Sequence, residues 1–328
     1  MTVIAGASLF NGVMLLSDCR TTITWPGGKS DVHADIAQKI FPLTLTTAIG
    51  FSGDGQTAAR LIKNVYYYLR HRKRVDAVSM NRWLPRFLRF TYRNISRKHR
   101  VAPLSFLVAS VVPDHPNIIE RRKVHEFMEI FRLKRSPIQR NFIPDVVVRI
   151  IMMPAEARYI AIPGTVRGLL YAMDAPDFIP RHVEPLNYHA IGSGEGTIRE
   201  IDKIADWLLA GQPGNDLIEA MALRDAVSEF IAAEGIVNVG GMFPCLKVDH
   251  RGVTLLGHSM GLPGEQVSVC FDPTRGRWSQ SNDKTGKRME LMPPWEIDPS
   301  KIKTSILFDD WADATRSFNP RRLQRRIP

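Results

Sequence analysis

The second residue of the chain, Thr2, can act as a nucleophile once Met1 is removed. A threonine hydroxyl is a weak nucleophile unless a base takes its proton. An α-amino group has a reference pKa of about 7.7–8, so a free N-terminal threonine carries its own base a few bonds from its hydroxyl. Threonine is also small enough to allow ordinary removal of Met1. Many proteins begin with Met-Thr, however, so this pair alone indicates no particular activity.

Several other polar residues adjoin apolar or glycine-containing stretches, and each has an ordinary structural explanation. Asp18 fits the end of a strand, and Lys39 fits an exposed strand edge. Gly192-Ser193-Gly194 fits a phosphate-binding loop or a turn before a helix. Asp225 and Ser228 fit the surface of a helix. Taken singly, none of these residues indicates a reaction.

Together with Thr2, these residues fall in five motifs that resemble, in the same order, those of proteasome β-subunits and their bacterial relatives. The motifs are Thr2-Val-Ile-Ala-Gly6 with Asn11-Gly-Val-Met-Leu-Leu-Ser-Asp-Cys-Arg-Thr-Thr22, Lys39-Ile-Phe-Pro-Leu43, Ala48-Ile-Gly-Phe-Ser-Gly-Asp54, Ala190-Ile-Gly-Ser-Gly194 and Arg224-Asp-Ala-Val-Ser228. Each motif is weak alone. Five of them in register, over about residues 2 to 260, are specific.

The resemblance implies an N-terminal-nucleophile hydrolase in which Thr2 attacks an amide carbonyl and its own α-amine acts as the base. Asp18 and Lys39 would form a buried ion pair beneath the nucleophile. There the ammonium favours the developing alkoxide, and the carboxylate compensates the ammonium. The backbone N–H of Gly50 would stabilise the oxyanion.

The resemblance also implies which residues order the amine and bind the substrate. Ser193, Asp225 and Ser228 would surround the Thr2 amine and fix its orientation and protonation. Thr22 occupies the position at which the family holds the substrate backbone as an added strand. Ala48 falls near the family's first specificity pocket.

Four features depart from the family's pattern. Ser228 is followed by Glu229, where family members usually have glycine, and a carboxylate near the amine would raise its pKa or shift the site geometry. Glu195 follows Gly194, where small residues are common. The span from about 113 to 157 is longer than the family core needs, and so is the chain after about 272. These features leave the standard ring geometry and a specific protease substrate open.

The elements that must position these residues follow from turn signals and hydrophobic periodicity. Asn11-Gly12 lies between two apolar runs and predicts a buried hairpin. Asp54 can cap a helix over about 55–74, and a second helix is expected over about 80–98. The remaining strands are predicted at 39–43, 45–51, 104–112, 166–173, 188–192, 238–249 and 252–258, and the remaining helices at 196–210 and 215–233.

This order of strands and helix pairs predicts an α+β fold in which helices cover the outer faces of two stacked sheets. The family resemblance specifies a four-layer αββα sandwich, the N-terminal-nucleophile hydrolase fold. We expect one domain over 2–271 with an insertion at about 113–157. The polar chain over 272–328 is expected to be a partly ordered C-terminal extension.

The net charge of +11 is concentrated in one stretch. Arg70 to Arg100 contains eleven Lys or Arg and one acid, Asp76. Two exposed helix faces, a contact with an acidic protein, and nucleic-acid binding all fit this pattern. Nucleic acid is the least favoured, because the interleaved Trp83, Phe90 and Tyr92 also suit the buried face of an amphipathic helix.

Composition excludes several other classes of protein. No apolar run is long enough to predict a membrane span, and no signal peptide is recognisable. Three widely spaced cysteines indicate a reducing compartment, so we expect a cytoplasmic protein. His182, Glu184 and His189 match no strong metal motif, and no cofactor is expected.

The sequence therefore predicts a threonine-type amidohydrolase, active on peptide bonds and assembled as a homo-oligomer, in a ring or an open spiral. Two alternatives remain open: a catalytically idle scaffold of the same fold, and a hydrolase of small non-peptide amides.

Overall fold

The computed structural model describes residues 2–9, 12–23, 31–44, 46–70, 77–96, 103–113, 166–205, 216–236, 238–249, 252–256, 258–262, 265–272, 277–282, 286, 288–303 and 305–307. These residues form a mixed α/β fold with mostly antiparallel sheets and four α-helices. The predicted insertion lies almost entirely outside the described residues.

One five-stranded antiparallel sheet is built around the N-terminal hairpin, in the order β10-β1-β2-β11-β12. Its strands are β1 (Val3–Leu9), β2 (Gly12–Ser17), β10 (Tyr188–Gly192), β11 (Cys245–Asp249) and β12 (Gly252–Leu256). Every residue of β1 and β2 is buried, so the predicted buried hairpin is confirmed. Burial on both faces explains why these strands are apolar throughout rather than alternating.

The second five-stranded sheet has the order β5-β6-β7-β8-β9. Its strands are β5 (Ile40–Thr44), β6 (Thr47–Gly53), β7 (Leu104–Pro113), β8 (Val166–Asp174) and β9 (Arg181–Val183). The predicted strands at 39–43, 45–51, 104–112 and 166–173 are therefore confirmed, with ends that differ by one to two residues.

Four α-helices flank the two sheets: α1 (Gly55–Arg70), α2 (Ala77–Ser96), α6 (Ile198–Asp202) and α8 (Asp216–Ala233). The cap predicted for α1 is present, since the Thr57 backbone N–H donates to Asp54 Oδ2 at 3.0 Å. The predicted helix at 196–210 is divided, because the 3₁₀ turn η2 (Ser193–Thr197) comes before the five-residue α6.

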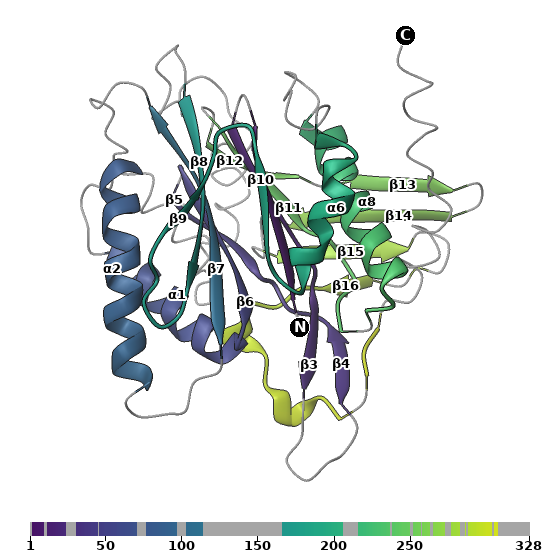
Figure 1. Ribbon diagram of the computed structural model, residues 1–328. Helices are drawn as coiled ribbons and strands as arrows, with labels where there is room; N and C mark the ends of the chain where they lie inside the picture. The colour runs from purple at the N-terminus through teal and green to yellow at the C-terminus, as the bar shows by residue number, and fades with distance from the viewer. Residues whose placement is uncertain are drawn as a thin grey trace, which may run out of the picture.

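Three apolar clusters hold these elements together. One lies between α1, α2 and the outer face of the second sheet, one lies between α8 and the outer face of the first sheet, and one lies between the two sheets. Figure 1 shows the helix pairs on opposite sides of the sheets. The alternation along β1 fits this arrangement: Val3 and Ala5 face α8, whereas Ile4 faces the second sheet.

Two smaller sheets complete the described residues. β3 (Arg20–Ile23) and β4 (Val32–Asp35) form a hairpin that projects beyond the main sheets (Figure 1). The fourth sheet, in the order β13-β14-β15-β16, contains β13 (His258–Leu262), β14 (Glu265–Asp272), β15 (Arg277–Asn282) and β16 (Arg288–Glu290). Two 3₁₀ turns follow, η3 (Pro294–Glu296) and η4 (Pro299–Lys301).

The predicted strand over 238–249 begins too early. Strand β11 starts only at Cys245, and the segment before it is a turn in which Gly240 and Gly241 have positive φ. The Gly240 carbonyl accepts a hydrogen bond from the Cys19 backbone N–H, so this turn contacts the end of β2 instead of extending a strand.

None of the helices in the described residues is both long enough and apolar enough to cross a bilayer.

Candidate active site

Thr2 lies at the N-terminal end of β1, where the two main sheets meet. Val3 pairs with Gly192, and the Ser193 backbone N–H donates to the Thr2 carbonyl at 2.9 Å, which extends this pairing by one residue. Only 5% of Thr2 is exposed. Gly192 has φ +72°, and a Cβ there would overlap the Thr2 carbonyl oxygen, so glycine is required beside the candidate nucleophile.

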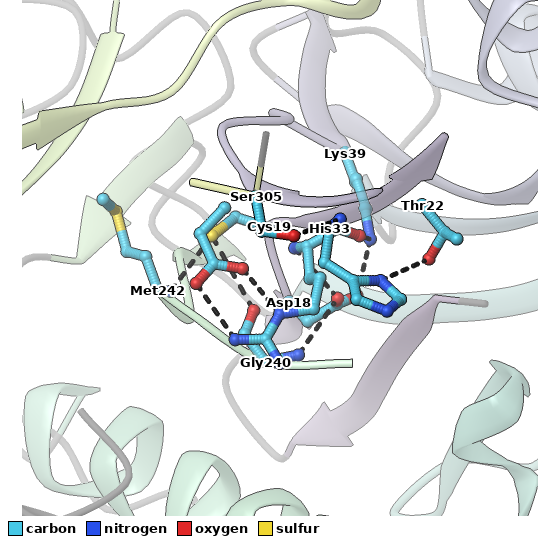
Figure 2. Close-up of polar contacts among 10 residues, drawn as sticks. Asp18, Cys19, Thr22, His33, Lys39, Gly240, Met242 and Ser305 are labelled. Carbon is cyan, nitrogen blue, oxygen red and sulfur yellow. Dashed lines mark hydrogen bonds and ion pairs between the residues drawn. The ribbon is translucent and has the colours of Figure 1, made fainter. Parts of the chain in front are cut away.

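Asp18 and Lys39 form a buried ion pair that contacts the backbone of Val3, the residue after Thr2. Lys39 Nζ donates to Asp18 Oδ1 at 2.9 Å, and the two side chains are 3% and 0% exposed. The same carboxylate oxygen accepts from the Val3 backbone N–H at 2.9 Å, one residue from Thr2. Lys39 Nζ also donates to the Arg20 carbonyl at 2.6 Å. The pair that the sequence predicts is therefore present (Figure 2).

The Asp18 carboxylate has several hydrogen-bond donors in addition to Lys39. The backbone N–H of Arg20 donates to Oδ2 at 3.1 Å, and that of Gly240 donates at 3.5 Å. Burial raises the pKa of the Asp18 carboxyl, while Lys39 and the backbone amides of Val3 and Gly240 act against that shift. Each of these donors stabilises the ionised carboxylate of Asp18. The backbone donors also fix the position of the carboxylate, which in turn holds the ammonium of Lys39.

Gly50 lies on β6 directly opposite Ile40, the residue after Lys39. The Phe51 backbone N–H donates to the Lys39 carbonyl at 3.1 Å, so β6 passes the backbone of the lysine. A Cβ on Gly50 would lie 2.8 Å from Ile4 Cγ2 on the facing sheet, closer than carbon atoms approach. Glycine at this position therefore lets β1 and β6 approach each other. Because the Phe51 N–H points to β5, the Gly50 N–H points to β7 and pairs with Leu107, so the predicted oxyanion donor is engaged in the sheet.

Asp225 and Ser228 lie one turn apart on α8, both less than 10% exposed. The Arg224 Nε donates to Asp225 Oδ1 at 2.6 Å. Asp225 Oδ2 and Ser228 Oγ have no hydrogen-bond partner among the described residues. Burial raises the pKa of Asp225 to about 6; Arg224 opposes this shift and Glu229 adds to it.

Ser193, by contrast, contacts Thr2 directly through the backbone. It opens η2, which packs between β1 and α8. In the described part of the chain, no hydrogen bond joins Asp225 or Ser228 to Thr2, Asp18 or Lys39. The structure thus assembles one group of predicted residues around Asp18 and a second group on α8.

The two predicted substrate-binding residues have different environments. Thr22 is partly exposed on β3, and its Oγ1 lies 3.2 Å from His33 Nδ1 on β4 (Figure 2). Ala48 is fully buried in the cluster between the sheets, so its side chain faces the protein interior and not solvent.

Several polar contacts beside the ion pair were not predicted from the sequence. Arg20 forms a two-point contact with Asp35, from Nε to Oδ1 at 2.7 Å and from Nη2 to Oδ2 at 3.0 Å. His33 stands opposite Thr22 in the same hairpin. Both contacts follow from the antiparallel pairing of residues 20–23 with 32–35. This pairing could not be predicted, because the two short strands are separated by a polar loop.

Among the described residues, no group of three or more His, Cys, Asp or Glu side chains is arranged to hold a metal ion. No protein-family model and no curated protein sequence matches the chain.

Proposed function

We propose that this chain is a threonine-type N-terminal-nucleophile amidohydrolase of the proteasome β-subunit type, which cleaves peptide bonds after Met1 is removed. The arrangement of helices and sheets supports assignment to the four-layer αββα sandwich of that family. The observation that carries the proposal is the buried Asp18–Lys39 pair, whose carboxylate also binds the backbone of the residue next to Thr2.

In the proposed reaction, the free α-amine of Thr2 takes the proton of the Thr2 hydroxyl as its oxygen attacks the substrate carbonyl. The ammonium of Lys39 favours the developing alkoxide. A backbone N–H other than that of Gly50, which pairs within the sheet, would donate to the oxyanion; such a donor typically contributes about a hundred- to a thousand-fold in rate. The protonated amine then gives its proton to the leaving nitrogen, which leaves an ester on Thr2. Water hydrolyses that ester and restores the hydroxyl.

Asp225 and Ser228 are proposed to orient the amine together with Ser193. The buried oxygens of Asp225 and Ser228 without partners support this role, because an α-ammonium supplies three N–H donors. Glu229 would add negative potential at the same place and so raise the pKa of the amine.

A catalytically idle scaffold of the same fold is the second candidate. The low exposure of Thr2 favours it, since a substrate carbonyl must reach the hydroxyl. Hydrolysis of small amides is a variant of the first proposal, and the choice between peptides and small amides depends on the shape of the pocket. For either candidate we propose a cytoplasmic homo-oligomer with an acidic protein partner at Arg70–Arg100.

The decisive experiment is the intact mass of the purified protein before and after treatment with an acylating β-lactone. We expect Met1 to be absent and one probe molecule to add to Thr2. The Thr2→Ala variant should bind no probe and hydrolyse no peptide while remaining folded by circular dichroism. Lys39→Ala should also label far more slowly. A retained Met1, or a free Thr2 that stays unlabelled, would identify the idle scaffold.

A further inference from the structure

The C-terminal residues 291–303 and 305–307, which together we call the C-terminal strap, run beside the strands that carry the candidate site. The Met292 backbone N–H donates to the Ile36 carbonyl at 2.6 Å, and the Gln38 N–H donates to the Met292 carbonyl at 2.9 Å. Further along, Ile306 pairs in parallel with Ala34 on β4. The strap is therefore bonded to the chain on both sides of Ile36.

Apolar contacts anchor the strap at two places. The ring of Trp295 lies 5.3 Å from that of Phe41 and 6.3 Å from that of Tyr66, between centroids, so η3 packs where α1 meets the second sheet. Ile302 is 8% exposed and packs in a separate small cluster with Ile23 and Ala34 of the β3–β4 hairpin. These contacts tie the projecting hairpin to the body of the protein.

The strap holds His33 by both backbone groups. The His33 N–H donates to Ser305 Oγ at 3.2 Å, and the Ile306 N–H donates to the His33 carbonyl at 2.8 Å. The imidazole of His33 in turn lies at hydrogen-bonding distance from Thr22 Oγ1 (Figure 2). A continuous chain of hydrogen bonds therefore runs from the strap through β4 to the side chain of Thr22.

The strap occupies one edge of β4, and β3 occupies the other. The second edge of β3 pairs with no strand among the described residues. A two-stranded hairpin is only marginally stable alone in water. The strap acts as a third strand on the edge of β4 that faces away from β3, so it would hold β3 in place before a ligand adds to the other edge of β3. Less conformational entropy is then lost when the ligand binds.

We propose that the C-terminal strap is a positioning element for substrate binding, in which Ser305 and Ile306 act through His33 to hold β3 and Thr22 ready for an extended substrate strand. This inference rests on the proposed function, in which Thr22 binds the substrate backbone. It assigns a role to the C-terminal extension that the five family-like motifs do not include.

The test removes a single strap hydrogen bond. Ile306→Pro deletes the N–H that donates to the His33 carbonyl, whereas the matched control Ile306→Ala keeps it; the Ile306 side chain is 41% exposed and contributes little packing. We expect Ile306→Pro to raise KM for an extended peptide by about 2- to 10-fold, the effect typical of one hydrogen bond, with kcat little changed. Ile306→Ala should behave like the wild type.

Two further measurements separate positioning from general stability. Labelling of Thr2 by the small β-lactone, which does not need the open edge of β3, should keep its wild-type rate in Ile306→Pro. Hydrogen exchange at the β3 amides should be faster in Ile306→Pro than in Ile306→Ala or the wild type. Ser305→Ala, which deletes the acceptor for the His33 N–H, should repeat both effects if Ile306→Pro does not fold.

Equal KM values for Ile306→Pro and Ile306→Ala would overturn the proposal. If the wild type shows neither labelling nor turnover, the proposed function fails by itself. In that case the proposed role of the strap still predicts faster hydrogen exchange at the β3 amides in Ile306→Pro than in Ile306→Ala. Identical exchange in the two variants would overturn that role as well.

Discussion

The carboxylate of Asp18 binds three backbone amides and the ammonium of Lys39. A buried charge is costly unless it is paired and hydrogen-bonded, and here both conditions are met. The arrangement joins three segments that are distant in sequence: the start of β1, the end of β2 and the turn at Gly240. Asp18 therefore holds the ammonium of Lys39 and the backbone of the residue after Thr2 in one arrangement.

The raised pKa of Asp225 predicts how the stability of the protein changes between pH 4 and pH 7. Its pKa in the folded protein is about 6, above its ordinary value of 3.8. The stability linked to the protonated carboxyl is therefore fully present below about pH 4 and is lost as the pH rises through 6. We expect the free energy of unfolding of the wild type, relative to Asp225→Asn, to fall by up to about 3 kcal/mol between pH 4 and pH 7.

Urea denaturation of both proteins across this pH range measures the difference. Other titrating groups contribute equally to the two proteins, so they cancel. A difference that stays constant with pH would show that the pKa of Asp225 is the same in the folded and the unfolded protein, as expected if Arg224 offsets burial.

At the scale of elements, α8 is fastened to the first sheet by a buried ion cluster. Lys247 on β11 is fully buried and contacts Asp216 and Glu219, both in the first turn of α8. Burial raises the pKa of Glu219, and Lys247 opposes this shift. Since α8 also carries Asp225 and Ser228, this cluster determines how firmly the two residues that we propose to order the amine are held.

We expect Lys247→Met to lower the free energy of unfolding by about 3–5 kcal/mol at pH 7, because it leaves buried Glu219 without its cation. The double variant Lys247→Met/Glu219→Gln should recover a large part of that loss, since it removes the uncompensated charge as well. Chemical denaturation of the three proteins tests this. A double variant no more stable than Lys247→Met would mean that packing around the lysine stem, and not charge, holds α8.

The elements with strong local signals were predictable from sequence. The apolar runs of β1 and β2 and the cap at Asp54 led to correct assignments. The fourth sheet and the strap were not predicted as ordered elements. The strands of the fourth sheet pair with their neighbours along the chain but lie in a largely polar, interrupted region, whereas the strap gains order from partners far away in sequence. Ile302 and Trp295 follow no clear helix or strand periodicity, and only their contacts with the β3–β4 hairpin and with α1 give them a structural role.

The candidate site shows the same division. Asp18 and Lys39 were identified together only through family-like motifs, and their contact depends on the pairing of β5 with β6 and the closing of β2 onto β1. His33 and Asp35 belong to no motif. Their positions follow from the register of the β3–β4 hairpin, which the loop between the strands concealed.

At the scale of the whole molecule, positive charge gathers on one helical layer. The helices α1 and α2 contain no acidic residue and seven basic ones, Arg60, Lys63, Arg70, Arg82, Arg86, Arg89 and Arg93. Tyr67 and Phe90 are 65% and 68% exposed on the same two helices. Figure 1 places this layer on the far side of the sheets from α6 and α8. Exposed aromatic rings among arginines are typical of protein interfaces.

We therefore expect this layer to bind an acidic polypeptide, with poly-glutamate as the probe. Reversal of two exposed charges, in Arg82→Glu/Arg86→Glu, should weaken binding about tenfold at low salt, because each exposed charge pair contributes up to about 1 kcal/mol and reversal also adds repulsion. Arg167→Glu/Arg199→Glu changes the net charge equally at exposed sites outside the two helices and should bind like the wild type. Isothermal titration of these proteins at low salt and at about 0.5 M salt separates a local surface from net charge. At the higher salt concentration, exposed charges interact over only a few ångströms.

Equal weakening of binding in the two double variants would assign binding to net charge alone. Tighter binding of single-stranded DNA than of poly-glutamate would identify the layer as a nucleic-acid surface.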